Sequence, residues 1–170
     1  MRVSTKWLLL GLIVGLTLLD QGSKWLAQSY LVPAHPVPLI PGVFQLTLAY
    51  NTGAAFSMLN NQPLLLTGFT SLVFIGLLVY GLLRSHMLKS ELLGLALILG
   101  GALGNLIDRV RLGHVIDFLD VVAIHYPVFN VADSFIFCGV ILWGAMQLKS
   151  QPQPEASSPP VTFHDAPRES

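Results

Sequence analysis

Four apolar segments, each close to the length of a membrane span, divide the chain. They run from about Trp7 to Leu26, from Leu64 to Leu83, from Leu92 to about Ile107, and from about Val128 to Leu148. About 20 apolar residues in a helix cross the hydrocarbon core of a bilayer, and a helix bonds its backbone polar groups internally. The pattern therefore predicts an all-α integral membrane protein with four transmembrane helices.

The first segment also allows a second interpretation. Arg2 and Lys6 precede a short apolar stretch, which is typical of a secretory signal, and Ala27 and Ser29 could form its cleavage site. The stretch from residue 20 to residue 25 is more charged than a cleavage region requires. We therefore expect a retained helix.

The segments outside the predicted helices differ from one another. Within residues 30–63, FQLTLAY (44–50) is rich in strand-forming residues and NTG (51–53) is a turn signal, which predicts a small extracytoplasmic β element between helices 1 and 2. Residues 151–170 contain five prolines. We expect one transmembrane domain over 1–149 and a disordered cytoplasmic tail over 150–170.

The positions of Lys and Arg predict the orientation. Basic residues flank one set of helix ends: Arg2, Lys6, Arg84, Lys89 and Lys149. Residues 30–63 contain no charged residue. Because basic residues concentrate on the cytoplasmic side, both termini and the 84–91 loop should be cytoplasmic, with 30–63 and 112–127 outside. Arg109 and Arg111 are exceptions on the outer side.

Composition agrees with a membrane protein, since 53% of the residues are hydrophobic and 11% are charged. Nine basic residues balance nine acidic ones, so no basic face for nucleic acid is predicted. The one cysteine, Cys138, has no internal disulfide partner. The protein is expected to contact membrane lipid. A monomer is expected, because four helices are enough to enclose an internal site.

Polar residues within or beside the apolar segments gather at one depth, near the outer ends of helices 1, 3 and 4. They are Asp20, Lys24, Asn105, Asp108, Arg109, Asn130 and Asp133. Neighbours in each group are three or four positions apart, so they share a helix face. A carboxylate at bilayer depth costs on the order of a few kcal/mol unless it is paired, so these groups should face the bundle interior or a wet cleft.

One interpretation of these residues is structural, with Asp20 paired to Lys24 and Asp108 paired to Arg109 or Arg111. A count of charges near the outer face argues against this role for the whole set, because five acids face three bases. The acids are Asp20, Asp108, Asp117, Asp120 and Asp133, and the bases are Lys24, Arg109 and Arg111. Two acids would remain without a basic partner.

Two unpaired acids indicate either proton movement or acid–base hydrolysis. Two carboxyls that share a proton can act as base and acid, because their repulsion separates their pKa values. Asp133 is the first candidate, and its partner is Asp117, Asp120 or an acid of helix 1, a choice that spacing leaves open. His114 and His125 lack a third ligand in a recognised spacing, so no metal site is predicted.

Several small or amide residues have predicted supporting roles. Gly100, Gly101 and Gly104 should let another helix come close. Asn51 and Asn130 can donate to a carbonyl or hold an acid, and equally can cap a turn or a helix. Gly53 allows a positive φ and a close approach of the backbone to a substrate.

Four blocks of the sequence resemble, in order, the signature blocks of the prolipoprotein signal peptidases, also called signal peptidase II. They are DQGSK (20–24), NTGAAFS (51–57), GNLIDRVRLGHVIDF (104–118) and FNVADS (129–134). The resemblance covers roughly residues 7–148. It implies a bacterial inner-membrane aspartic endopeptidase that removes the signal peptide from diacylglyceryl-modified prolipoproteins, cutting before the lipidated cysteine by carboxylate-activated water.

The same resemblance implies that Asp117 and Asp133 are the catalytic pair and that no cofactor or metal takes part. It also implies residues that shape the site or bind the substrate: Asp20, Lys24, Asn51, Gly53, Asn105, Asp108, Arg109, Asn130 and Ala132. Two other classes stay open on the residues alone. A proton-coupled transporter would string acids across the membrane, whereas the inner halves of the predicted helices lack charge, and an assembly subunit would not require unpaired acids at one depth.

Overall fold

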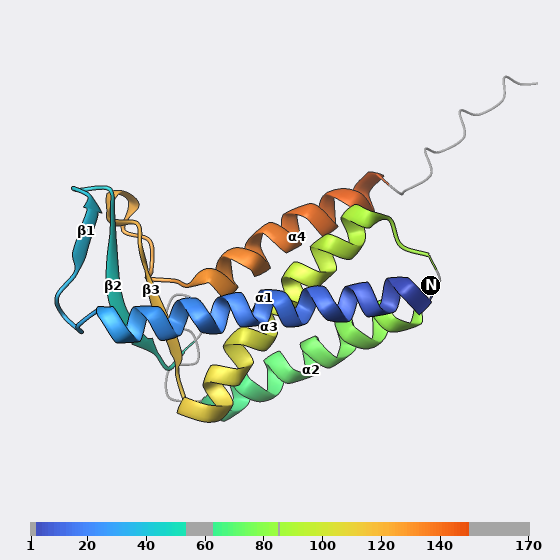
Figure 1. Cartoon of the computed structure of the whole chain (residues 1–170), viewed down its shortest axis with the longest axis horizontal. Coiled ribbons are helices and arrows are strands. Elements are labelled where there is room, and N and C mark those ends of the chain that lie inside the picture. Colours follow the sequence, from blue (N-terminus) through green and yellow to red (C-terminus); the bar gives the residue numbers. More distant parts are fainter. Residues whose placement is uncertain (1–2, 54–62, 85, 150–170) are drawn as a thin grey trace, which may run out of the picture.

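A computed structural model describes residues 3–53, 63–84 and 86–149, so the predicted tail lies outside the described residues. Within them the helices are α1 (Val3–Tyr30), α2 (Pro63–Leu83), α3 (Lys89–Leu112) and α4 (Val131–Lys149), and the strands are β1 (Val37–Ile40), β2 (Phe44–Asn51) and β3 (Val115–Asp120). A short 3-10 helix, η2 (Val122–Ile124), follows β3. Figure 1 shows the helices gathered at one end and the strands at the other.

Helix α3 is the centre of the bundle and contacts α1, α2 and α4. Its apolar residues Leu92, Leu95 and Leu99 are buried against Leu9 and Ile13 of α1. These positions recur every three or four residues, so they form one stripe on each helix. The apolar pattern of the sequence thus determines which faces of α1 and α3 meet.

Glycines on α3 allow the other helices to come close, as predicted. A Cβ at Gly104 would lie 2.3 Å from the Oδ2 atom of Asp20 on α1, and one at Gly101 would lie 2.4 Å from the carbonyl oxygen of Ala132 on α4. Real Cβ atoms do not approach other atoms so closely, so a side chain at either position would push the helices apart. The prediction of close helix packing is confirmed.

The strands form an antiparallel sheet in the order β1-β2-β3. β1 pairs with β2 at Val37 and Leu46, and β2 pairs with β3 at Ala49 and Asp117. The predicted β element between the first two helices is present as β1 and β2. The third strand comes from the segment between α3 and α4, where the sequence patterns had predicted no strand.

The sides of the bundle expose large apolar residues. On α2, Leu64 is 86% exposed and Leu72 is 70% exposed. By length and apolarity, the helices over Leu64–Leu83 and Lys89–Leu112 qualify as membrane spans, whereas the apolar part of α4, Val131–Met146, is shorter. The described residues therefore contain the four predicted helices, of which two meet this criterion.

An acid is buried at the start of α3, at the end predicted to be cytoplasmic. Because α3 begins at Lys89, three residues earlier than predicted, Glu91 lies in its first turn and is 3% exposed. Its carboxylate accepts the N–H of Leu88 at 3.0 Å and lies 3.7 Å from Arg84. The expectation that the inner halves of the helices lack charge is wrong at this position. These two partners of the acid, however, belong to the segment that directly precedes α3.

Candidate active site

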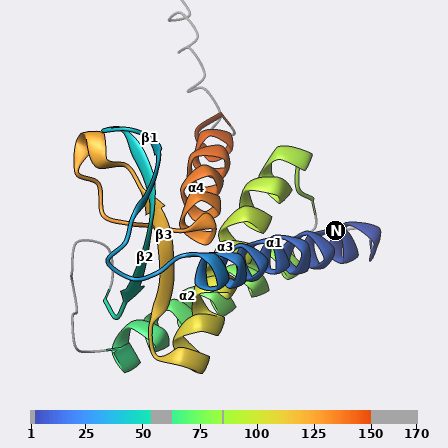
Figure 2. The same ribbon diagram turned by 60° about the vertical axis from the view of Figure 1, so that its left-hand side comes forward.

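A cluster of polar side chains lies where α1, α3, β3 and the start of α4 meet. Figure 2 shows the sheet standing against the end of the bundle at which α4 begins. Six of the predicted site residues with polar side chains are buried here: Asp20, Lys24, Asn105, Asp108, Asp117 and Asn130. Asn51, Arg109 and Asp133 are half-buried at its edge. The structure thus brings together residues from three of the four helices and two strands.

Lys24 is the centre of the cluster on the α1 side. Its Nζ lies 2.9 Å from the Oδ2 atom of Asp20 and 2.8 Å from the Oδ2 atom of Asp108. It also donates to the Oδ1 atom of Asn105 at 2.9 Å. The predicted Asp20–Lys24 pair is confirmed. The expected pairing of Asp108 with a neighbouring arginine is wrong, since Lys24 of another helix takes that place.

Gln21 is a site residue that sequence reasoning missed. Its Nε2 donates to the Oδ1 atom of Asp108 at 2.8 Å and lies 3.1 Å from the carbonyl oxygen of Gly104 and 3.3 Å from the Oδ2 atom of Asp20. Consecutive helix residues do not share a face, so its place beside Asp20 gave no sign of this role. Only the packing of α3 on α1 brings its partners within reach.

The start of α4 positions Asp133 through local geometry. The Oδ1 atom of Asn130 accepts the N–H of Asp133 at 2.9 Å, and the Oδ2 atom of Asp133 accepts the N–H of Asn130 at 3.1 Å. This reciprocal arrangement resembles a capping box, with Asp at the third helical position. The N–H of Ala132 donates to the Oδ1 atom of Asp20 at 3.0 Å, which ties this helix end to α1.

Asn130 also connects the two predicted catalytic acids. Its Nδ2 donates to the Oδ1 atom of Asp117 at 2.7 Å, while its backbone N–H donates to Asp133. Asn51 donates to the other oxygen of Asp117 at 2.9 Å, and Asn105 donates to the Oδ1 atom of Asp133 at 2.8 Å. Among the described residues, neither carboxylate forms a direct ion pair.

The surroundings of Asp117 alter its acidity. Burial raises the pKa of Asp117 from 3.8 to about 7, and the charge of Asp133 contributes in the same direction, whereas the hydrogen bonds from Asn51 and Asn130 oppose it. A buried carboxyl prefers its neutral form because the charged form loses its hydration. At neutral pH this group can therefore donate a proton as readily as accept one.

Arg109 and Gly53 lie at the edge of this arrangement. The guanidinium of Arg109 is close enough to act electrostatically on Asp133, Asp117 and Asp108. The N–H of Gly53 donates to the Oδ1 atom of Asn51 at 3.0 Å and so orients that amide toward Asp117. Gly53 does not use a positive φ, which within the described glycines occurs at 42 and 113.

The alternative partners for Asp133 have other contacts. Asp120 lies at the far end of β3, where its Oδ2 atom accepts bonds from Gln45 at 2.7 Å and Thr47 at 2.9 Å. The acid of helix 1, Asp20, is paired with Lys24. Of the three candidates that spacing left open, Asp117 is the one joined to Asp133 through Asn130.

Apolar helices with exposed apolar sides and a buried acid cluster at one end define a helical membrane protein with a site suited to acid–base chemistry. A bacterial membrane enzyme solved by the in meso method has a similar fold, with a TM-score of 0.77 and 29% identity over 88% of this chain and 90% of that chain. A second bacterial membrane enzyme solved in the same way gives a TM-score of 0.75 at 29% identity, covering 89% and 97% of the two chains.

The family model described as signal peptidase (SPase) II matches residues 12–149. The lipoprotein signal peptidase of Caldanaerobacter subterraneus subsp. tengcongensis is 47% identical over 131 residues, which are 76% of this chain and 88% of that protein. The lipoprotein signal peptidase of Acinetobacter baumannii is 48% identical over 140 residues, 78% of each chain. The chain belongs to the signal peptidase II family, which confirms the resemblance seen in the four sequence blocks.

Proposed function

We propose that this protein is an intramembrane aspartic endopeptidase that removes the signal peptide from diacylglyceryl-modified prolipoproteins, cutting before the lipidated cysteine. Membership of a peptidase family supports hydrolysis of a peptide bond over transport or assembly. The observation that carries the aspartic mechanism is the placement of two carboxyls. Asp117 and Asp133 come from a strand and a helix, and both accept hydrogen bonds from Asn130.

The lengths of the helices support four membrane spans. α1, α2, α3 and α4 contain 28, 21, 24 and 19 residues. At 1.5 Å per residue they measure about 42, 32, 36 and 29 Å. The hydrocarbon core of a bilayer is about 30 Å thick, so each helix is about long enough to cross it. The polar residues of α1 form hydrogen bonds and an ion pair with α3 and α4, which offsets the free-energy cost of placing them in the membrane.

The arrangement of the helix ends supports the predicted orientation. The start of α1, the α2–α3 connection and the end of α4 lie at one end of the bundle, opposite the sheet (Figure 1). Arg84 and Lys89 belong to that end, which the distribution of basic residues assigns to the cytoplasm. In this placement both termini are cytoplasmic and the acid cluster lies near the outer face of the bacterial inner membrane.

Hydrolysis begins with a water molecule held between the two carboxyls. Asp133 acts as the base and takes a proton from the water, whose oxygen attacks the scissile carbonyl carbon. Asp117 donates its proton to the carbonyl oxygen, so the tetrahedral intermediate is a neutral gem-diol. The raised pKa of Asp117 supports this assignment, because the group holds a proton near neutral pH.

Collapse of the intermediate breaks the C–N bond. Asp133 passes the proton that it took from water to the leaving nitrogen, while Asp117 recovers its proton from a hydroxyl of the gem-diol. The products are a carboxylic acid at the end of the signal peptide and a free amine on the lipidated cysteine. Both carboxyls return to their initial state without an acyl-enzyme.

The other predicted residues position this pair. Asn51, Asn105 and Asn130 donate to the two acids and fix their direction. Lys24 holds Asn105 together with Asp20 and Asp108, and Arg109 offsets the negative charge of the cluster. The backbone groups of Gly53 and Ala132 hold Asn51 and the start of α4.

The peptidase unit in this proposal is residues 1–149, with 150–170 as its cytoplasmic tail, and the family match over 12–149 supports the boundary. One chain supplies every residue of the cluster, so a monomer is sufficient. The substrate is a lipid-modified precursor that reaches the site from within the membrane, and no cofactor is assigned to the reaction.

The test is cleavage of a diacylglyceryl-modified precursor by the purified protein in detergent. Asp117→Asn and Asp133→Asn should each lower turnover by roughly 10²–10⁴-fold with precursor binding retained, because each removes a proton-transfer group. Asp120→Asn is the matched control, since it makes the same change on the same strand away from the cluster, and it should cleave normally. Turnover in either dyad variant at the level of the unaltered protein would refute the assignment, and absence of cleavage by the unaltered protein would refute the function.

A further inference from the structure

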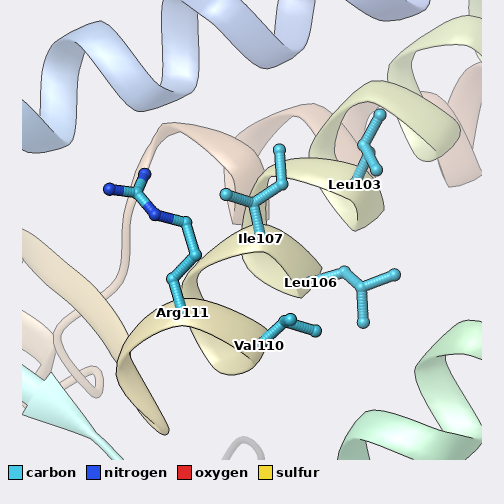
Figure 3. A pocket seen from close by; sticks show the side chains of 5 residues that line it. All are labelled: Leu103, Leu106, Ile107, Val110 and Arg111. Carbon is cyan, nitrogen blue, oxygen red and sulfur yellow. The ribbon is translucent and has the colours of Figure 1, made fainter.

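A groove lies on the side of α3 that faces away from the acid cluster. It has a volume of about 280 Å³ and almost wholly apolar walls, formed by Leu103, Leu106, Ile107, Val110 and Arg111. Figure 3 shows these side chains along one side of α3, with the Arg111 guanidinium directed toward α1. At 3.6 residues per turn, Val110 points about 140° away from Asn105, which bonds Asp133. The groove is therefore separate from the candidate active site.

Arg111 carries a charge that no described residue pairs with. Its side chain is exposed, and among the described residues it takes part in no ion pair or hydrogen bond. The acid three positions earlier, Asp108, is bound to Lys24. Arg111 is also one of the two basic residues that depart from the cytoplasmic concentration of charge. An exposed guanidinium beside an apolar groove, with no acid paired to it among the described residues, is available to bind an anion.

The length of the groove matches one leaflet of a bilayer. From Leu103 to Arg111 the helix rises about 12 Å at 1.5 Å per residue. Half of a hydrocarbon core that is about 30 Å thick is about 15 Å. With Arg111 at the outer end of α3, the apolar walls extend from the level of the headgroups toward the middle of the membrane. The volume of the groove suits part of one acyl chain rather than a whole small molecule.

We propose that this groove binds an anionic phospholipid of the outer leaflet, with one acyl chain along Leu103, Leu106 and Val110 and the phosphate on Arg111. This site rests on the proposed placement of the helices in the membrane and does not depend on the proteolytic reaction. A guanidinium fits a phosphate well, because two parallel N–H groups can donate to two of its oxygens.

The same features argue against the diacylglyceryl group of a substrate as the occupant. That group is uncharged, so it gives Arg111 no ionic partner. Its cysteine must also reach the two carboxyls, which lie on the other side of α3. A structural phospholipid meets both the charge and the position of the groove.

Native mass spectrometry of the purified full chain, titrated with phosphatidylglycerol, tests the proposal. Arg111→Gln should weaken the Kd at least tenfold, since a hydrogen-bonded charged group typically contributes that much or more. Arg111→Lys, which keeps the charge and loses the paired N–H groups, should show a smaller loss. Lys89→Gln is the matched control, because it removes an exposed charge at the opposite end of the same helix, and it should bind normally.

Other ligands test whether both the anionic headgroup and the acyl chains are needed for binding. Phosphatidylcholine and diacylglycerol should bind at least several-fold more weakly than phosphatidylglycerol, and glycerophosphate, which lacks acyl chains, should not compete. Equal losses in Arg111→Gln and Lys89→Gln, unchanged binding in Arg111→Gln, or competition by glycerophosphate would each overturn the lipid site. Precursor cleavage is measured on the same samples, so failure of the lipid site and failure of the peptidase function give different results.

Discussion

The Oδ1 atom of Asp20 accepts the backbone N–H of Ala132 at 3.0 Å, across 112 positions of the sequence. Because Asp133 follows Ala132 directly, this bond holds the first turn of α4, and with it a proposed catalytic carboxyl, against α1. The other oxygen of Asp20 is paired with Lys24. Through these two contacts Asp20 fixes a helix end of the site.

The first prediction concerns this contact. Asp20→Ala removes both the acceptor for Ala132 and a partner of Lys24, and should lower the free energy of unfolding by about 1–3 kcal/mol. Asp20→Asn keeps an oxygen acceptor, so its free energy of unfolding should lie between those of the unaltered protein and Asp20→Ala. Thermal unfolding in detergent and turnover of the precursor measure the effects. An unchanged Tm in Asp20→Ala would show that the bond does not hold α4.

The second prediction concerns the close approach of α1 and α3. Gly104→Ala would place a Cβ 2.3 Å from the Oδ2 atom of Asp20, so the helices must separate. Overpacking of this kind costs about 1–3 kcal/mol, and we expect a lower Tm together with reduced cleavage. Gly22→Ala is the control, because a Cβ there meets nothing within 4 Å. If both variants unfold at the same temperature, this contact does not limit packing.

The third prediction concerns pH. Burial raises the pKa of Asp117 to about 7, so its proton, which the mechanism gives to the carbonyl oxygen, is lost as the pH rises through that value. The kcat/KM for precursor cleavage should therefore fall above about pH 7. A profile that stays level to pH 9 would contradict the assignment of Asp117 as the acid.

The raised pKa of Asp117 also makes the stability of the folded protein depend on pH. Between 3.8 and about 7 the folded protein keeps a proton on Asp117 that the unfolded chain has released. The contribution of Asp117 to the free energy of unfolding therefore falls as the pH rises across this range and is level above it. The difference in Tm between the unaltered protein and Asp117→Asn, followed from pH 4 to pH 8, isolates this contribution.

The fourth prediction concerns Asn130. Asn130→Ser retains a side chain that caps a helix and removes the amide that donates to Asp117 at 2.7 Å. That bond lowers the pKa of Asp117, so its loss should move the alkaline limb of the pH profile to higher pH. A purely structural role for Asn130 would lower turnover without moving this limb. Tm measurements on the same variant show whether the helix start is intact.

Local patterns in the sequence predicted a large part of the fold. The four helices follow from runs of apolar residues. The start of α4 lies at Val131 and not near Val128 as predicted, because Asn130 and Asp133 bond to each other across three positions and begin the helix there. The close packing at Gly101 and Gly104 was also predicted, because small residues are needed where helices touch. Each of these features depends on neighbours in the chain or on residue size.

Strand β3 was missed for a physical reason. VIDFLD carries acids at Asp117 and Asp120, and these interrupt the apolar alternation that indicates a strand. The segment is held in place by β2, where Asn51 pairs with Val115 across more than 60 positions. Pairing of that range has no local signal, since the strand forms only when its partner is present.

By itself the sequence determined the helices, the family blocks and the set of acids available at one depth. Only the tertiary structure decided their partners. Lys24 takes Asp108 as well as Asp20, and Asp117 rather than Asp120 meets Asn130. The 16-residue connection between Asp117 and Asp133 permits many separations, so its length cannot select one. The packing of α1, α3 and α4 fixes the distances, because buried polar groups must find partners wherever those helices bring them together.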